Sequence, residues 1–269
     1  MDERPDPRNR PKPNAPSASD DGRHAGFKQQ VFDDKNAREV RDTAKTRAPR
    51  PKPAGTLILT RRRQGTFDML MGRRVNTHTF MPGKYVFPGG RVDRADYRAA
   101  APSQLKPHIE ARLEAQDALS LGRAQAMASV RETFEEVGIT LGRPFERTPR
   151  TKSPAWQAFY AGGLGPALAD LHLVARAITP PYRPKRFDAR FFLAEAEDFL
   201  TSDGLDGEHS GELADIGWFT PEAANGLDLP IITRLVIEEV AERMAGKKSL
   251  EAKGPFVYFS AGKPVVDEA

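Results

Sequence analysis

The sequence predicts an α+β or α/β fold, in which a mixed β-sheet carries helices on its faces. Two observations indicate this class. Short runs rich in β-branched and aromatic residues occur together with longer amphipathic segments, and 39% of the 269 residues are hydrophobic, enough to bury a sizeable core. The pattern begins abruptly after residue 53, so residues 54–269 are expected to form the folded domain.

Residues 1–53 have a different composition. They hold 8 of the 23 prolines and few large apolar side chains, which is typical of a disordered tail. They also hold 13 of the 41 Lys and Arg and 9 of the 37 Asp and Glu, so the tail carries the whole net charge of +4. The neutral remainder gives little support for a nucleic-acid partner.

The first elements of the domain are expected to be strands. The runs 55–62 and 66–74 are joined by the turn-prone letters RRQG, which predicts a β-hairpin. The run KYVFPGG at 84–90 predicts a third short strand that Pro-Gly-Gly stops.

A loop and two helices follow these strands. Residues 103–122 are expected to become helical in their latter part and to end at Gly122. Residues 124–138 predict a second helix ending at Gly138, a typical place for a helix-ending glycine. The buried face of this second helix is expected to carry Ala126, Val130, Thr133, Phe134 and Val137.

The rest of the chain predicts further strands and helices. Strands are expected at 171–179, 186–196, 216–220 and 255–260, and a long amphipathic helix at 229–246. A short helix at 220–226 has Thr220 as its N-cap and Pro221 in its first position. Trp156 and Trp218 are expected to lie in the core.

Some classes of protein are disfavoured by composition. The chain has no cysteine, which excludes disulfides, thiolate metal sites and a cysteine nucleophile. The histidines His78, His108 and His172 are isolated, so a histidine metal site is not expected. Neither a secretory signal nor a window of about 18 apolar residues is found, and we expect a cytoplasmic protein without a membrane span.

Three glutamates in the second helix are candidate ligands of a metal ion. Glu132, Glu135 and Glu136 are three and four residues apart, so a helix places them near one face. Their carboxylates repel one another, and a hard divalent cation such as Mg²⁺ or Mn²⁺ would make the cluster useful. Arg131 could hold one carboxylate through a bidentate pair. Taken alone, an adjacent Glu pair indicates only a solvated helix surface.

The wider sequence pattern favours a functional site over a solvated helix surface. FPGGRVDRAD at 87–96 and RETFEEVGI at 131–139 together resemble the signature of the Nudix hydrolases, G-x5-E-x7-R-E-U-x-E-E-x-G-U, where U is a bulky aliphatic residue. Gly90 matches the first glycine, and the second half is matched by Arg131, Glu132, Glu135, Glu136, Gly138 and Ile139. Two positions depart from the signature: Asp96 stands where Glu is usual, and Thr133 stands where an aliphatic residue is usual.

The spacing between the two halves of the signature is similar to that of one subgroup of the family. Between Asp96 and Arg131 lie 34 residues where the signature has seven, so residues 97–123 are expected to be a helical insertion within the box. A subgroup of Nudix proteins that includes coenzyme A and acyl-CoA diphosphatases of the peroxisomal type has an insertion at this place. The sequence is similar to that subgroup in FPGGRVDRAD and in ITPPYRPKRFDARFF at 178–192.

The resemblance implies a fold and an activity. The fold would be an α/β/α sandwich with a mixed sheet. The activity would be the metal-dependent cleavage of the diphosphate in a nucleoside diphosphate linked to a group X, with coenzyme A or acyl-CoA as the favoured small-molecule substrate. NADH, ADP-ribose and nucleotide sugars are rival substrates. A non-catalytic nucleotide-binding or interaction module, and an RNA-processing enzyme that uses the basic tail, are alternatives from other classes.

The resemblance also implies the roles of individual residues. The catalytic residues would be Arg131, Glu132 and Glu135, and the ligands of Mg²⁺ or Mn²⁺ would be Glu132, Glu135 and Glu136, with Asp96 as a further candidate. One of these glutamates, or a carboxylate from a later loop, would act as general base. The substrate would contact Gly89 and Gly90, which let the backbone approach phosphates, and Arg73, Arg74 and Arg186 are further candidates for this contact. Arg186 and Asp188 alternate with Phe187, as in a half-buried strand, and could line the pocket or form a structural ion pair.

Overall fold

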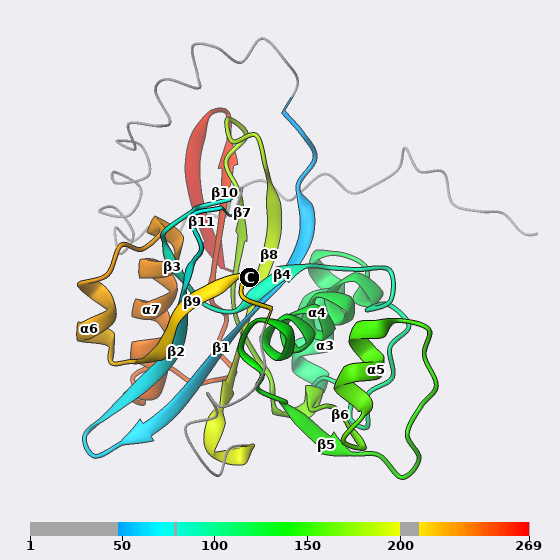
Figure 1. Cartoon of the computed structure of the whole chain (residues 1–269). Helices are drawn as coiled ribbons and strands as arrows, with labels where there is room; N and C mark the ends of the chain where they lie inside the picture. The colour runs from blue at the N-terminus through cyan, green and yellow to red at the C-terminus, as the bar shows by residue number, and fades with distance from the viewer. Residues whose placement is uncertain (1–47, 78–79, 200–209, 269) are drawn as a thin grey trace, which may run out of the picture.

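A computed structural model describes residues 48–77, 80–199 and 210–268 of the chain (Figure 1). Most of the predicted tail and His78 lie outside these residues. The disorder of the tail and the domain boundary at residue 54 therefore stay predictions, although the first strand already begins at Lys52.

A mixed sheet of nine strands forms the centre of the described structure. Its main order is β11-β10-β7-β8-β1-β2-β3, while β4 pairs with β1 and β9 pairs with β2. β1 and β8 are parallel, as are β7 and β10, and the other pairs are antiparallel. The strands are β1 (Lys52–Arg63), β2 (Thr66–Arg74), β3 (Tyr85–Val86), β4 (Gly89–Arg91), β7 (His172–Ile178), β8 (Phe187–Glu195), β9 (Leu213–Phe219), β10 (Pro255–Ser260) and β11 (Lys263–Glu268).

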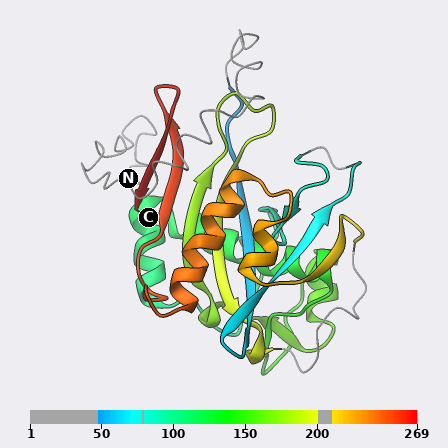
Figure 2. The same cartoon turned by 90° about the vertical axis from the view of Figure 1, so that its left-hand side faces the viewer.

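Helices cover both faces of this sheet, which confirms the predicted α/β/α arrangement. One face carries α3 (Pro107–Gln116), α4 (Leu119–Val137) and α5 (Pro154–Tyr160), drawn in green in Figure 1. The other face carries α6 (Pro221–Asn225) and α7 (Ile231–Met244), which stand in front of the strands in Figure 2. A small second sheet, β5 (Gly142–Pro144) and β6 (Leu164–Pro166), and two short 3₁₀ helices, Leu168–Asp170 and Ala196–Asp198, complete the described elements.

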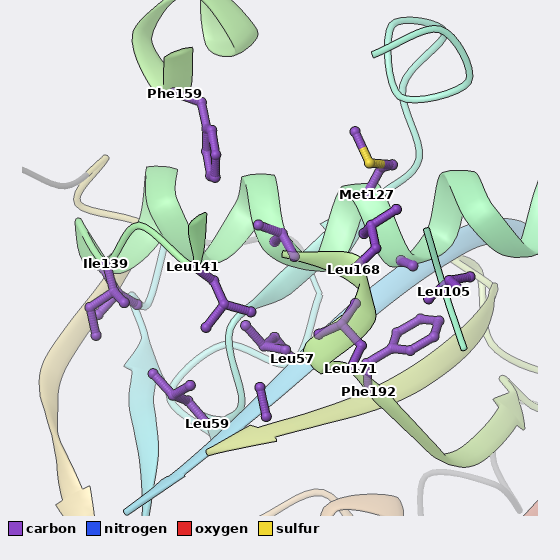
Figure 3. Close-up of a cluster of buried hydrophobic side chains, with 14 of the residues drawn as sticks. Leu57, Leu59, Leu105, Met127, Ile139, Leu141, Phe159, Leu168, Leu171 and Phe192 are labelled. Atoms are coloured by element: carbon purple, nitrogen blue, oxygen red, sulfur yellow. The ribbon is translucent and has the colours of Figure 1, made fainter. Parts of the chain in front are cut away.

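The two faces of the sheet bury two separate hydrophobic clusters. Successive residues of β1 point to opposite faces, so Leu57 and Leu59 pack against α4 while Ile58 packs against α7. The first cluster, with Leu57, Leu59 and Phe192 under the α4 helix, is shown in Figure 3. Since α4 carries the predicted catalytic glutamates, this cluster fixes the position of the candidate site relative to the sheet.

The predicted hairpin is confirmed, but the third strand differs from the prediction. Gly65 has a φ of +74° and closes the turn between β1 and β2. Strand pairing does not stop at the glycines of KYVFPGG. The chain continues as β4, which lies antiparallel to residues 54–56 of β1. A Cβ on Gly89 would lie 2.5 Å from the carbonyl oxygen of Gly55, so only glycine allows this close approach.

The helix boundary predicted at Gly122 is wrong, whereas the one at Gly138 is confirmed. The break between α3 and α4 falls at residues 117–118, and Gly122 lies inside α4. A Cβ at Gly122 would lie 2.9 Å from the side chain of Leu113, so this glycine serves the contact between the two helices. Gly138, with a φ of +82°, ends α4 and donates its N–H to the carbonyl of Phe134.

Residues 97–123 contain α3 and the first residues of α4. Their status as an insertion relative to related proteins stays a prediction.

The downstream strands β7, β8, β9 and β10 and the helices α6 and α7 confirm their predictions. The Thr220 side chain caps α6 by accepting a hydrogen bond from the N–H of Ala223 at 3.2 Å. The sequence patterns did not predict α5, β5, β6 and β11. No helix in the described ranges combines the length and the apolar character that crossing a membrane requires.

Candidate active site

The two halves of the predicted box meet where β4 lies against α4. A Cβ on Gly90 would lie 2.4 Å from Cδ of Glu132, so the missing side chain leaves the space that this carboxylate fills. The N–H of Gly89 donates a hydrogen bond of 2.9 Å to Oε2 of Glu136. The glycine pair therefore contacts the acidic helix directly, although about forty residues separate them in the sequence.

Arg131 joins two of the glutamates. Its guanidinium is buried, and its Nη1 donates to Oε1 of Glu132 at 2.8 Å and to Oε2 of Glu135 at 2.7 Å. One cation thus offsets the repulsion between two neighbouring carboxylates and fixes their orientation.

Asp96 lies on the other side of the same guanidinium. Its Oδ1 accepts from Nε of Arg131 at 2.9 Å, and its Oδ2 accepts from Nη2 at 3.0 Å. Oδ1 also accepts from the indole Nε1 of Trp156 at 3.0 Å, and Oδ2 from the backbone N–H of Asp93 at 2.8 Å. The side chain is fully buried and each oxygen already has two donors. This geometry favours Asp96 as the anchor of Arg131 over the metal ligand that the sequence suggested.

Burial shifts the pKa of two of the glutamates. Burial raises the pKa of Glu132 to about 7, and the charge of Arg131 opposes this shift. Burial likewise raises the pKa of Glu136 to about 8, opposed by the hydrogen bond from Gly89 and by the charge of Arg74. Burial thus disfavours the anionic form of both carboxylates, and positive charge added beside them would favour it.

The donor set suits a hard divalent cation. Glu132, Glu135 and Glu136 each use one oxygen for Arg131 or Gly89, and their second oxygens accept no hydrogen bond from a described residue. Oxygen ligands of this kind are those that Mg²⁺ and Mn²⁺ prefer. Within the described ranges, however, no three acidic or histidine side chains are already arranged to hold a metal ion. The glutamates would have to reorient from their contacts with Arg131.

Glu212 is a further acidic residue near the site, and no sequence pattern identified it. Its negative charge raises the pKa of both Glu132 and Glu136. Strand pairing explains its position: β9 pairs with the end of β2, and the N–H of Val75 donates to the Glu212 carbonyl at 3.1 Å. The N–H of Ser210 also donates to the carbonyl of Glu135 at 2.7 Å. No local motif marks Glu212, because only this long-range pairing brings it to α4.

The predicted substrate-binding arginines have other contacts. Nε of Arg73 lies 2.6 Å from Oδ2 of Asp215, and it is the adjacent Arg74 whose charge acts on Glu136. Arg186 donates to the carbonyls of Thr179 at 2.9 Å and of Pro49 at 2.8 Å, which ties the start of β8 to the chain before β1. No contact among the described residues joins Arg73 or Arg186 to the glutamates, and their roles in substrate binding stay predictions.

Asp188 and the two tryptophans have structural contacts. Asp188 forms an ion pair with Arg176, with contacts of 2.9 and 2.7 Å, rather than the predicted pair with Arg186. Trp156 is fully buried, and Trp218 is partly buried with the guanidinium of Arg61 above its ring at 4.6 Å. Trp156 is thus a core residue that also reaches the candidate site through Asp96.

The described fold is that of the Nudix hydrolases. A solved structure of a Nudix hydrolase from Alicyclobacillus acidocaldarius superposes with a TM-score of 0.56 and 25% sequence identity, over 74% of this chain and 96% of that one. No family model matches the chain. Among curated proteins, the chain is similar to the acyl-coenzyme A diphosphatase NUDT19 of Gallus gallus, at 36% identity over 125 residues. That match covers 37% of this chain and 33% of the relative, so it spans about a third of the relative's length.

Proposed function

We propose that the protein is a divalent-metal-dependent hydrolase that cleaves the diphosphate linkage of a nucleoside diphosphate bound to a further group. One observation carries this proposal: Glu132 and Glu136 lie beside the glycine strand β4, Glu135 shares Arg131 with Glu132, and each of the three has one carboxylate oxygen that accepts no hydrogen bond from the described residues. The Nudix hydrolase fold and the resemblance of the box to the Nudix signature support it.

Each residue of the site has a role in this proposal. Glu132, Glu135 and Glu136 would hold Mg²⁺ or Mn²⁺, and the bound ion would neutralise phosphoryl charge and lower the pKa of water. Arg131 orients Glu132 and Glu135. A water oxygen attacks phosphorus, and the bond from phosphorus to the bridging oxygen breaks. Glu212 is our candidate for the group that accepts the proton of this water, because it is an acidic residue of a later loop and its charge acts on both Glu132 and Glu136.

The favoured substrate is coenzyme A or an acyl-CoA. The similarity to the acyl-CoA diphosphatase NUDT19 and the subgroup resemblance of FPGGRVDRAD and ITPPYRPKRFDARFF support this choice. Hydrolysis of coenzyme A at the diphosphate would release a phosphopantetheine product and a nucleotide product.

A metal-dependent substrate screen tests both the proposed hydrolysis and the proposed substrate. The full chain is incubated with Mg²⁺ or Mn²⁺ and coenzyme A, an acyl-CoA, NADH, ADP-ribose or a nucleotide sugar, and products are identified by mass spectrometry. We expect phosphopantetheine from coenzyme A and none after chelation of the metal. Turnover of another compound but not of coenzyme A or acyl-CoA would refute the substrate assignment. Nucleotide binding without turnover of any compound would refute hydrolysis and favour a non-catalytic module.

A further inference from the structure

The indole of Trp156 lies outside the box, in α5, yet it contacts the network that orients the glutamates. Its Nε1 donates to Oδ1 of Asp96 at 3.0 Å, and neither side chain is exposed to solvent. The ring is held in place by its neighbours Phe159 and Tyr160, at centroid distances of 5.4 and 5.6 Å.

A continuous series of short contacts leads from this indole to the acidic helix. Asp96 binds the Nε and Nη2 side of Arg131, and the Nη1 side of Arg131 binds Glu132 and Glu135. Each bond in the series joins partly or fully buried groups. The indole N–H is therefore one of the donors that hold Asp96, and Asp96 in turn holds the guanidinium.

The split of the box explains why such a contact is needed. With 34 residues between Asp96 and Arg131, the intervening chain itself does not keep them close. The helix α5 contacts the start of this segment at two points, since the hydroxyl of Tyr160 also donates to the carbonyl of Ala100 at 2.9 Å.

We propose that Trp156 is a positioning residue for the metal-binding glutamates, acting through Asp96 and Arg131. The inference rests on the proposed function for the identity of those glutamates. When the indole N–H is present, it holds Asp96 in place, and Asp96 accepts hydrogen bonds from two nitrogens of Arg131. When the N–H is removed, Asp96 loses one of its four hydrogen bonds and holds the guanidinium less firmly. Arg131 then pairs more strongly with Glu132 and Glu135 and competes with the cation.

The test compares Trp156→Phe with Tyr160→Phe in the full chain. Both variants keep an aromatic ring in α5 and lose one hydrogen bond, but only the first loses a bond to Asp96. Mn²⁺ binding to the metal-free protein is measured by electron paramagnetic resonance, without substrate. We expect Trp156→Phe to weaken Mn²⁺ binding on the order of tenfold, and Tyr160→Phe to bind as the wild type does. Equal affinity in all three proteins would overturn the inference, as would an equal loss in both variants.

A second variant covers the possibility that Trp156→Phe does not fold. Site-specific replacement of Trp156 by 3-benzothienylalanine keeps the bicyclic shape and removes only the N–H donor. The same loss of Mn²⁺ affinity is expected, and unchanged affinity would contradict the proposed role. Failure of the proposed function is seen separately, because a wild-type protein that binds Mn²⁺ but hydrolyses no diphosphate leaves the effect of Trp156 on binding measurable. A wild-type protein that binds no Mn²⁺ would overturn both proposals.

Discussion

The change Glu136→Gln should stabilise the metal-free protein at high pH while it abolishes activity. Glu136 is almost fully buried, and its Oε2 accepts the N–H of Gly89 at 2.9 Å. Glutamine has nearly the same shape and can present its amide oxygen to the same N–H. The substitution therefore removes the charge and keeps the hydrogen bond.

The magnitude follows from the pKa of the carboxyl group. Burial raises this pKa from 4.5 to about 8, so the folded protein binds a proton more tightly than the unfolded chain between these values. The stability that the group contributes is complete below about pH 4.5 and is lost as the pH rises to 8. A shift of this size corresponds to roughly 5 kcal/mol. A buried glutamine amide also loses its contacts with water on folding, which offsets part of this gain, so we expect Glu136→Gln to recover about half, or roughly 2–3 kcal/mol, above pH 8.

Urea denaturation at pH 5.5 and pH 9 in the presence of EDTA measures this effect. We expect wild type and Glu136→Gln to differ more at pH 9 than at pH 5.5, with the variant the more stable at pH 9. Saturating Mn²⁺ should stabilise the wild type more than the variant, because binding to the folded state adds to its stability. Glu114→Gln, at an exposed position of α3, is the matched control and should change neither quantity. A variant less stable than wild type at both pH values, or one that keeps full diphosphatase activity, would refute the reasoning.

Three further predictions concern the glycine strand, the core and a buried histidine. Gly90→Ala places a methyl group 2.4 Å from Cδ of Glu132, and should lower kcat at least tenfold in the coenzyme A assay while the far-UV circular dichroism spectrum stays unchanged. Leu57→Ala removes a fully buried side chain from the cluster under α4 and should lower the free energy of unfolding in urea by about 2–5 kcal/mol. Burial and the charges of Lys106 and His108 lower the pKa of His172 to about 4, so acidification from pH 6.5 to 4 should destabilise the wild type more than His172→Gln in thermal unfolding.

Local sequence patterns predicted the elements, and long-range pairing determined most of what they missed. Gly138 ends α4 in the left-handed conformation, and its N–H donates to the carbonyl of Phe134. A glycine directly after a helical pattern is a local signal for such an end. Gly122 lies within a helix because Leu113 of α3 packs on it, and this contact cannot be read from neighbouring residues. The hairpin, β7, β8 and α7 were likewise predictable from periodicity and turn residues. The strand β11 lacked a clear pattern, since its six residues KPVVDE include a proline and three charges.

The residues of the candidate site likewise fall into those that a sequence pattern predicts and those that only the fold brings together. The family signature alone is enough to identify Glu132, Glu135, Glu136 and Gly90. It gives no indication of Glu212, which approaches α4 only because β9 pairs with the end of β2. The spacing of residues along one chain carries no information about such neighbours, so their identification needs the fold.

The contacts of Asp96 explain how the two halves of the box stay together when 34 residues separate them. Closing a flexible loop of 34 residues instead of seven costs about (3/2)RT ln(34/7), or roughly 1.4 kcal/mol. Four donors converge on the carboxylate of Asp96, and a hydrogen bond to a charged group contributes about 1.5–3 kcal/mol. A single one of these bonds is therefore enough to offset the longer loop. The shorter side chain of aspartate is no obstacle to these contacts, because the side chains of Arg131 and Trp156 reach Asp96.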